Sequence, residues 1–106
     1  MAQSKPEAEF ALFCRAHKLE PVAEFKFCPT RRWRADFGFP AQMMLVEIEG
    51  GIWTNGRHNR GSGFESDCEK YNHASLMGYR VFRFTPKMVA SGEAIRIVQE
   101  AIANGN

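Results

Sequence analysis

Residues 33–49 read WRADFGFPAQMMLVEIE, and this stretch decides the fold. Its side chains alternate between apolar and polar over Trp33–Phe39 and are mostly apolar over Met43–Glu49, which is typical of β-strands. Pro40 has no backbone N–H to donate to a sheet, so it closes the first strand. Because the connection between the two strands is short, we expect them to pair antiparallel.

The same stretch has an apolar face and a face that carries acids, because successive side chains of a strand point to opposite sides. The apolar faces comprise Ala35, Phe37 and Phe39 on the first strand and Met44, Val46 and Ile48 on the second. Asp36 belongs to the opposite face of the first strand, and Glu47 and Glu49 belong to that of the second. A short connection should therefore bring Asp36 beside Glu47.

Segments outside this hairpin complete a single α/β domain over residues 1–106. Hydrophobic spacing and end signals predict three helices and two more strands. We expect helices from Pro6 to about Lys18, over Phe64–Met77 and from Ser91 to Ala103, and strands over Val22–Cys28 and Tyr79–Thr85. Gly78 is expected to cap the second helix. The last strand is reached through a helix, so it should run parallel to the strand before it, and the order αβββαβα gives a mixed central sheet flanked by helices.

A glycine-rich segment, Gly50–Gly63, separates the hairpin from the second helix. It holds five glycines in fourteen residues, together with Arg57, His58 and Arg60. Loops of this length in a compact domain are usually functional or disordered.

The composition limits the class of protein. The chain has 106 residues, a formal net charge of +2 and 25% charged residues, which fit one globular domain. Three cysteines, an odd number without a CxxC pair, argue against a disulfide framework and for a reducing compartment. No apolar run approaches the roughly 20 residues that span a bilayer, and the N-terminus lacks the apolar core of a signal peptide, so we expect a cytoplasmic protein with no membrane partner.

The acidic face of the hairpin is the feature that predicts chemistry. Strands disfavour Asp and Glu, and burying carboxylates costs free energy unless a partner satisfies them. Asp36, Glu47 and Glu49 would repel one another, and a hard divalent cation, Mg²⁺ (or Mn²⁺), relieves this through oxygen ligands. Such a cation can activate water and neutralise a leaving oxygen, as phosphodiester hydrolysis requires. The alternative is a solvent-exposed face on which Glu47 and Glu49 are ordinary surface charges.

These acids also carry a resemblance to the PD-(D/E)XK nuclease superfamily, in which an Asp on the second strand is followed by Glu-x-Lys on the third. The corresponding runs are Ala35-Asp36-Phe37 and Val46-Glu47-Ile48-Glu49. Residues 28–89 most closely resemble the very-short-patch-repair-like branch, especially small phage and prophage proteins. Further residues that carry this likeness are Pro29 to Arg34, Gly50, Gly51, Gly56 to Gly61, Asp67, Lys70, Tyr71, Asn72, Gly78 and Val81 to Arg83.

The resemblance implies a restriction-endonuclease-like fold and a metal-dependent DNA endonuclease. It further implies a phage or prophage protein that acts in the cytoplasm of a bacterial host cell. Asp36, Glu47 and the Ile48 carbonyl would hold Mg²⁺ or Mn²⁺. Glu9, on the first helix, is a candidate supplementary ligand, because some members of the superfamily use an acid there.

The third motif position departs from the family pattern. Glu49 stands where the superfamily has Lys and cannot supply positive charge, so it would bind metal or activate water as a general base. Lys70, on the helix after the glycine-rich segment, or His58, within that segment, would then supply the charge or the proton. The alternative for Lys70 is a surface pair with Asp67 on the same helix.

Basic residues flank the acids and predict contacts to DNA phosphates, which match the planar fork of a guanidinium group. The candidates are Arg31, Arg32, Arg34, Arg57 and Arg60. One domain carries one site, so the protein would nick a single strand or form a homodimer to cut both.

Two other functions stay open because Glu49 lacks the positive charge of Lys. One is a nucleic-acid-binding module that has the fold without catalysis, and the other is a structural or partner-binding phage protein. An HNH arrangement of His58, Asn59 and His73 is disfavoured, because the glycine-rich segment does not provide the ββα unit that it needs.

Overall fold

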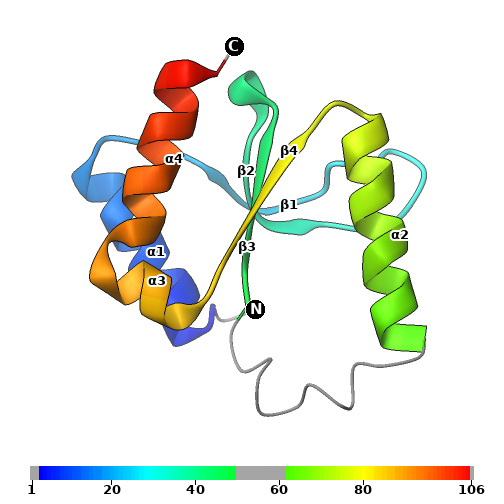
Figure 1. Ribbon diagram of the computed structural model, residues 1–106, viewed down its shortest axis with the longest axis horizontal. Coiled ribbons are helices and arrows are strands. Elements are labelled where there is room, and N and C mark those ends of the chain that lie inside the picture. Colours follow the sequence, from blue (N-terminus) through cyan, green and yellow to red (C-terminus); the bar gives the residue numbers. More distant parts are fainter. Residues whose placement is uncertain (1–2, 50–61, 106) are drawn as a thin grey trace.

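The computed structural model describes residues 3–49 and 62–105. Within them lie four strands and four α-helices, in the predicted order except that the last helix is divided in two (Figure 1). The elements are α1 (Lys5–Ala16), β1 (Val22–Phe25), β2 (Ala35–Phe39), the short 3-10 helix η1 (Pro40–Gln42), β3 (Met44–Ile48), α2 (Ser62–Leu76), β4 (Arg80–Phe84), α3 (Pro86–Ser91) and α4 (Glu93–Asn104). The expected α/β class and αβββαβα order are therefore confirmed.

The four strands form one mixed sheet in the order β1-β2-β3-β4. β1, β2 and β3 make the expected antiparallel meander, and β4 pairs with β3 in parallel. Figure 1 shows the sheet along its edge, with α2 on one side and α1, α3 and α4 on the other. The helical crossover from β3 to β4 is the one that the sequence predicted, because a parallel neighbour must be reached through a long connection.

Helix ends follow local signals closely. Ser4 and Glu7 form a capping box at the start of α1, in which Ser4 Oγ accepts from the Glu7 N–H at 3.3 Å and Glu7 Oε1 accepts from the Ser4 N–H at 2.9 Å. The helix ends earlier than predicted, and Lys18 is left-handed with φ 61°. Gly78 ends α2 as expected, with φ 95° and its N–H donated to the Ser75 carbonyl.

Two elements differ from the prediction. β1 stops at Phe25 rather than continuing to Cys28, and Glu24 has φ 51°, which interrupts the extended backbone just before that end. The last helix does not begin at Ser91, because Gly92 is left-handed (φ 89°) and separates α3 from α4. The Ser91 hydroxyl still accepts from the Glu93 N–H at 3.3 Å, so it assists the start of α4 from one position further back.

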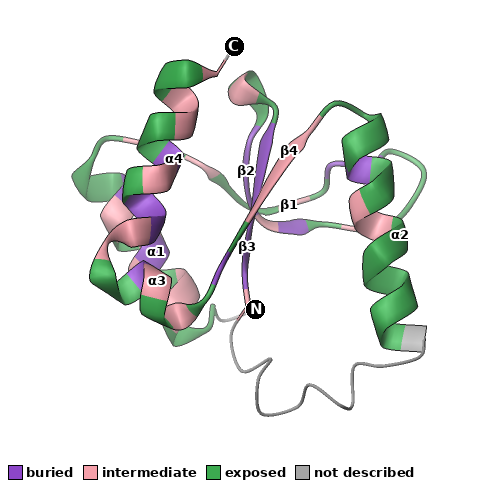
Figure 2. Cartoon of the chain, in the orientation of Figure 1, coloured by how far each residue is buried: buried purple, intermediate pink, exposed green. Residues whose placement is uncertain are grey.

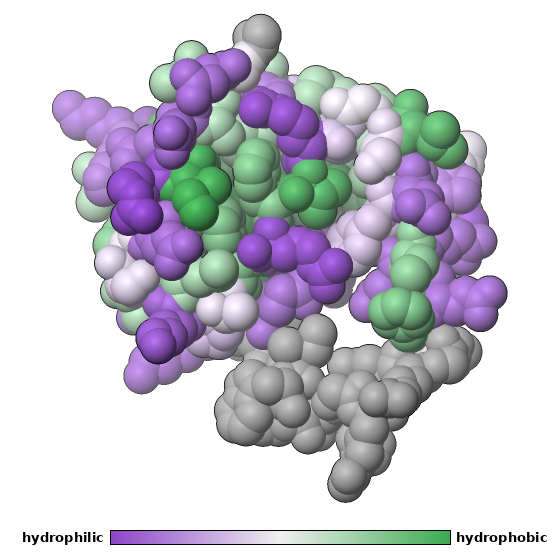
Figure 3. All heavy atoms as spheres, viewed as in Figure 1, coloured by the Kyte–Doolittle hydropathy of each residue, from purple (hydrophilic) through white to green (hydrophobic). Residues whose placement is uncertain are grey.

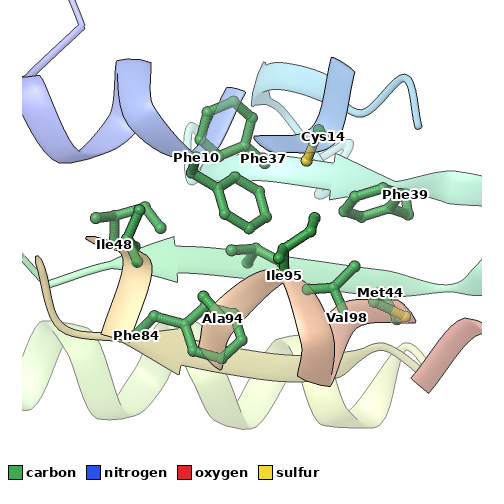
Figure 4. Packing of buried hydrophobic residues seen from close by; sticks show 12 residues of the cluster. Phe10, Cys14, Phe37, Phe39, Met44, Ile48, Phe84, Ala94, Ile95 and Val98 are labelled. Atoms are coloured by element: carbon green, nitrogen blue, oxygen red, sulfur yellow. The ribbon is translucent and has the colours of Figure 1, made fainter. Parts of the chain in front are cut away.

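The sheet is covered on both faces, and each face has its own core (Figure 2). The larger cluster lies under α1, α3 and α4 and includes Phe10, Phe37, Val46, Phe84 and Val98 (Figure 4). The smaller one lies under α2 and includes Phe27, Ala35, Leu45 and Ala74. Ala35 was expected beside Phe37 and Phe39, but it packs in the smaller cluster. It precedes the part of β2 that pairs with β3, so strict alternation does not extend to it.

The β4 edge of the sheet faces the viewer in Figure 1 and is unpaired in the described part of the chain. Figure 3 shows apolar surface over the middle of this side, between the two helical layers, with hydrophilic side chains around it. Among the helices that the structure describes, none combines the length and the apolar character needed to cross a membrane.

Candidate active site

Asp36 lies where β2 and β3 part from each other. The β2–β3 ladder runs from Phe39↔Met44 to Phe37↔Val46 and goes no further. Beyond it, the Ile48 N–H faces the β2 side without a ladder partner, and it donates to Asp36 Oδ2 at 2.7 Å. The N–H and C=O of one residue in a strand point to the same side, so the Ile48 carbonyl also faces this gap. Asp36 and the Ile48 carbonyl therefore belong to one small region, and their binding of a metal stays a prediction.

Glu47 lies on the α2 side of the sheet and is the buried charged residue of the site, with 8% of its surface exposed. Continuing the β2–β3 register by one step places Asp36 opposite Glu47. From α2, Lys70 donates to Glu47 Oε2 at 2.9 Å, and both side chains are largely shielded from solvent. Lys70 is thus paired with the strand acid rather than with Asp67 on its own helix.

Burial raises the pKa values of both acids. Desolvation is the largest cause for Asp36, whose pKa is raised to about 6, and the hydrogen bond from the Ile48 N–H opposes it. Desolvation is also the largest cause for Glu47, whose pKa is raised to about 7 although Lys70 lowers it. Carboxyl groups whose pKa values are raised by burial and by neighbouring acids cluster at functional sites, although structural ion pairs also shift pKa values.

Glu7 is a residue of this region that sequence reasoning missed. Its carboxyl group raises the pKa of Asp36, both as a like charge and as a hydrogen-bond partner. The sequence suggested Glu9 as the acid of the first helix that could assist a metal site. The residue that interacts with Asp36 is instead Glu7, in the first turn. The capping-box pattern Ser4-Lys5-Pro6-Glu7 fixes Glu7 at the third helical position, but no local pattern shows that this turn lies beside Asp36.

Glu49 is engaged by a cation from β4. Arg83 Nε donates to Glu49 Oε2 at 2.7 Å, and the Arg83 guanidinium carbon lies 4.7 Å from the centroid of the Tyr71 ring. The hydrogen bond with Glu49 raises the pKa of Arg83. Burial, and then the charges of Glu47 and Glu49, raise the pKa of Tyr71, so this phenol stays protonated.

The arginines that precede β2 have different surroundings. Arg31 stacks over the Trp33 ring at 4.0 Å and lies 3.8 Å from Glu69 on α2. Arg34 lies 3.5 Å from Glu24 on β1. Arg32 is exposed. Of these three arginines, Arg31 is the one tied to α2, the helix that also carries Lys70. The remaining candidates, Arg57, His58 and Arg60, lie outside the described residues.

The oxygen donors of this region suit a hard divalent cation. Asp36 and Glu47 supply two carboxylates and Ile48 a carbonyl, and Mg²⁺ is typically held by one or two carboxylates together with waters and substrate phosphate. Within residues 3–49 and 62–105, no three Asp, Glu, His or Cys side chains gather so as to hold a metal ion on their own. The oxygen donors of the site among these residues are therefore two carboxylates and one backbone carbonyl, which are the donor types that Mg²⁺ prefers.

Comparisons with known proteins agree with this fold. No protein-family model matches the chain, and no curated protein matches it in sequence. Among solved structures, the chain is similar to the catalytic domain of the homing endonuclease I-Bth0305I, with a TM-score of 0.65 and 12% identity over 93% of each chain. At this identity the likeness establishes a nuclease-type fold.

Proposed function

We propose that this protein is a metal-dependent DNA endonuclease that hydrolyses phosphodiester bonds. The observation that carries the proposal is the acid pair at the open end of the β2–β3 ladder, Asp36 and Glu47. Both have raised pKa values, and they lie beside a backbone carbonyl that can add a third oxygen ligand. The similar solved structure is the catalytic domain of an endonuclease, which supports DNA as the substrate.

Each residue has a role that its contacts support. Asp36, Glu47 and the Ile48 carbonyl would hold Mg²⁺ or Mn²⁺, and the Ile48 N–H fixes the orientation of the Asp36 carboxylate. When bound, the cation would supply a Lewis acid beside the scissile phosphate. Glu7 adds a further carboxyl next to Asp36.

Lys70 is the residue that we propose in place of the missing motif lysine. It reaches the acid pair from α2 rather than from β3, and its ammonium group lies 2.9 Å from Glu47 Oε2. There it can stabilise negative charge that develops on the phosphate, since a cation aimed at the reacting group is most effective where water is excluded. His58 remains a second proposed source of a proton, and Arg57 and Arg60 remain proposed DNA contacts.

Arg31 is the phosphate-binding candidate that its surroundings support best among those before β2. Stacking on Trp33 and the nearby Glu69 carboxylate hold its guanidinium beside α2 while it remains exposed. Arg32 and Arg34 remain proposed contacts on the same segment. Such contacts position a duplex without reading its sequence.

The test is cleavage of supercoiled plasmid and of branched DNA in Mg²⁺, Mn²⁺ or EDTA. Asp36→Asn is the matched variant, because an amide oxygen still accepts from the Ile48 N–H while the charge is lost. Glu100→Gln, an exposed carboxylate on α4, is the control. We expect cleavage by the wild type and by Glu100→Gln only with metal, and none by Asp36→Asn. Equal cleavage by Asp36→Asn would contradict the assignment.

A nucleic-acid-binding module without catalysis is the second candidate. It is favoured by the contacts of the two acids, because Lys70 donates to Glu47 and the Ile48 N–H donates to Asp36. Metal-independent DNA binding together with no cleavage by the wild type would support this candidate against the first.

A further inference from the structure

Arg83 stands next to the acid pair and has no part in the roles described so far. It is the cross-strand neighbour of Glu47 in the parallel β3–β4 register. Neighbouring strands lie roughly 4.8 Å apart, and paired residues share a face of the sheet. The Arg83 side chain therefore leaves the sheet on the side of Glu47, and 45% of it is exposed.

Two contacts fix the plane of its guanidinium group. Glu49 Oε2 accepts from Nε at 2.7 Å, and the face of the Tyr71 ring lies under the guanidinium carbon at 4.7 Å. The contact with Glu49 uses only Nε and leaves the two Nη groups, which carry the paired donors of the guanidinium fork. Within the described residues, those Nη groups donate no hydrogen bond.

We propose that Arg83 binds a DNA phosphate at this site and that Glu49 and Tyr71 are positioning residues that hold it. The inference rests on the proposed function and deepens it. The Nη fork matches a phosphate group with two parallel hydrogen bonds. On this assignment Glu49 does not hold the metal or activate water. It anchors Arg83 from β4 instead, so Arg83 adds a second cation at the site beside Lys70.

The first test measures DNA binding by Arg83→Gln without metal. Affinity for a fluorescein-labelled duplex is followed against salt concentration in EDTA, beside Arg96→Gln, an exposed arginine on α4 in the other helical layer. Loss of one phosphate contact should weaken binding roughly tenfold and reduce the salt-dependence slope by about 0.9. We expect both changes in Arg83→Gln and neither in Arg96→Gln. A wild-type slope and affinity in Arg83→Gln would overturn the proposal.

The second test separates anchoring from metal binding at Glu49. Glu49→Gln retains an oxygen that accepts from Arg83 Nε, whereas Glu49→Ala retains none. We expect Mn²⁺ affinity to be unchanged in both variants. DNA binding should stay near wild type in Glu49→Gln and fall in Glu49→Ala as far as in Arg83→Gln. The double variant Glu49→Ala/Arg83→Gln should be no weaker than either single one, because the two act as one unit. Loss of Mn²⁺ binding in Glu49→Gln would instead make Glu49 a metal ligand.

The outcome for Arg83 is distinct from the outcome for catalysis. A wild type that binds DNA and cuts none would contradict the proposed hydrolysis, while the salt slopes would still decide the role of Arg83. If the wild type cuts DNA, the Arg83→Gln substitution should raise KM more than it lowers kcat. A wild type that binds neither duplex nor branched DNA would overturn both proposals. Thermal unfolding of each variant confirms that it is folded.

Discussion

Glu47 is the residue on which the proposed chemistry depends most. Its carboxyl group is buried, stands opposite Asp36 and is paired with Lys70, and desolvation raises its pKa to about 7. A group in this state costs stability at neutral pH, because the charged form has lost its water. A cation at the site would recover that cost, so the acid pair is better suited to binding than to stabilising the fold.

Stability of the metal-free protein should reflect this cost. The folded pKa of Glu47, about 7, exceeds its ordinary value of 4.5, so the folded state holds an extra proton between these values. This extra proton adds to the free energy of unfolding. Its contribution is fully present below about pH 4.5 and is lost as the pH rises through about 7. Asp36, raised from 3.8 to about 6, acts in the same direction. For Glu47 the change over this whole range is on the order of 3 kcal/mol, because each pKa unit corresponds to about 1.4 kcal/mol.

Glu47→Gln removes this proton linkage and supplies the measurement. In EDTA, the free energy of unfolding of Glu47→Gln minus that of the wild type should be larger at pH 8 than at pH 5. The variant therefore becomes more stable relative to the wild type as pH rises. Denaturant titrations at the two pH values give both differences. Equal differences at the two pH values would show that Glu47 has an ordinary pKa in the folded protein.

Lys70, which pairs with Glu47 from α2, should be important for turnover. Lys70→Met leaves Glu47 without its cation, and it removes the charge that we assign to the reacting phosphate. We expect kcat to fall by roughly a hundredfold in Mg²⁺. Lys87→Met, an exposed lysine on α3, is the control. Wild-type turnover by Lys70→Met would mean that another cation serves the phosphate.

The sequence predicted the site residues that lie on a single strand or hairpin. Period-two alternation was enough to bring Asp36 beside Glu47. Arg83 and Glu7 were not found in this way, because each reaches the site from an element whose register depends on the tertiary packing. The partner of Glu49 is likewise set by the β3–β4 register, which follows from a crossover and not from a local pattern.

At the scale of single elements, the first turn of α1 contributes both to the start of the helix and to the site. Glu7 closes the capping box with Ser4 and also interacts with Asp36. Ser4→Ala removes the side-chain cap and should lower the free energy of unfolding by about 1 kcal/mol. The measurement is chemical denaturation beside Ser66→Ala, an exposed position on α2. An equal effect of the two substitutions would mean that the capping box contributes nothing.

The packing of β1 against β2 requires glycine at position 38. A Cβ on Gly38 would overlap the ring of Phe25, which lies over that position. Gly38→Ala should therefore displace Phe25 and destabilise the protein by about 1–3 kcal/mol. Gly63→Ala is the matched control, because nothing lies within 4 Å of a Cβ there. Alanine should be neutral or stabilising at that helical position. A neutral Gly38→Ala would show that β1 rearranges freely.

Element boundaries show where local signals are sufficient and where they are not. Gly78 predicted the end of α2 correctly, because glycine readily adopts the left-handed backbone conformation that ends a helix. Gly92 acts in the same way, yet the apolar residues after Ser91 suggested one helix with Ser91 as its cap. The left-handed Glu24 in β1 has no sequence signal, since non-glycine residues adopt such angles only when their neighbours impose them.

At the scale of the whole molecule, the site lies at one end of a sheet that is covered on both sides. The ends of β3 and β4, the start of β2 and the first turn of α1 meet there, and α2 closes the region from the opposite layer (Figure 1). The sequence predicted the order and directions of these strands, because a meander followed by a helical crossover leaves few alternatives, but it did not predict that α1 and β4 contribute to the site. The two helical layers let acids from the sheet meet a cation from α2.

The most direct measurement is a time course of supercoiled plasmid with Mn²⁺, comparing the wild type with Glu47→Gln. The substitution keeps the volume of the side chain and an acceptor for Lys70, but it removes the charge that a cation needs. The account predicts that the wild type converts plasmid to open circles before linear product accumulates, and that Glu47→Gln leaves it supercoiled. Equal nicking by both proteins, or nicking that persists in EDTA, would contradict it.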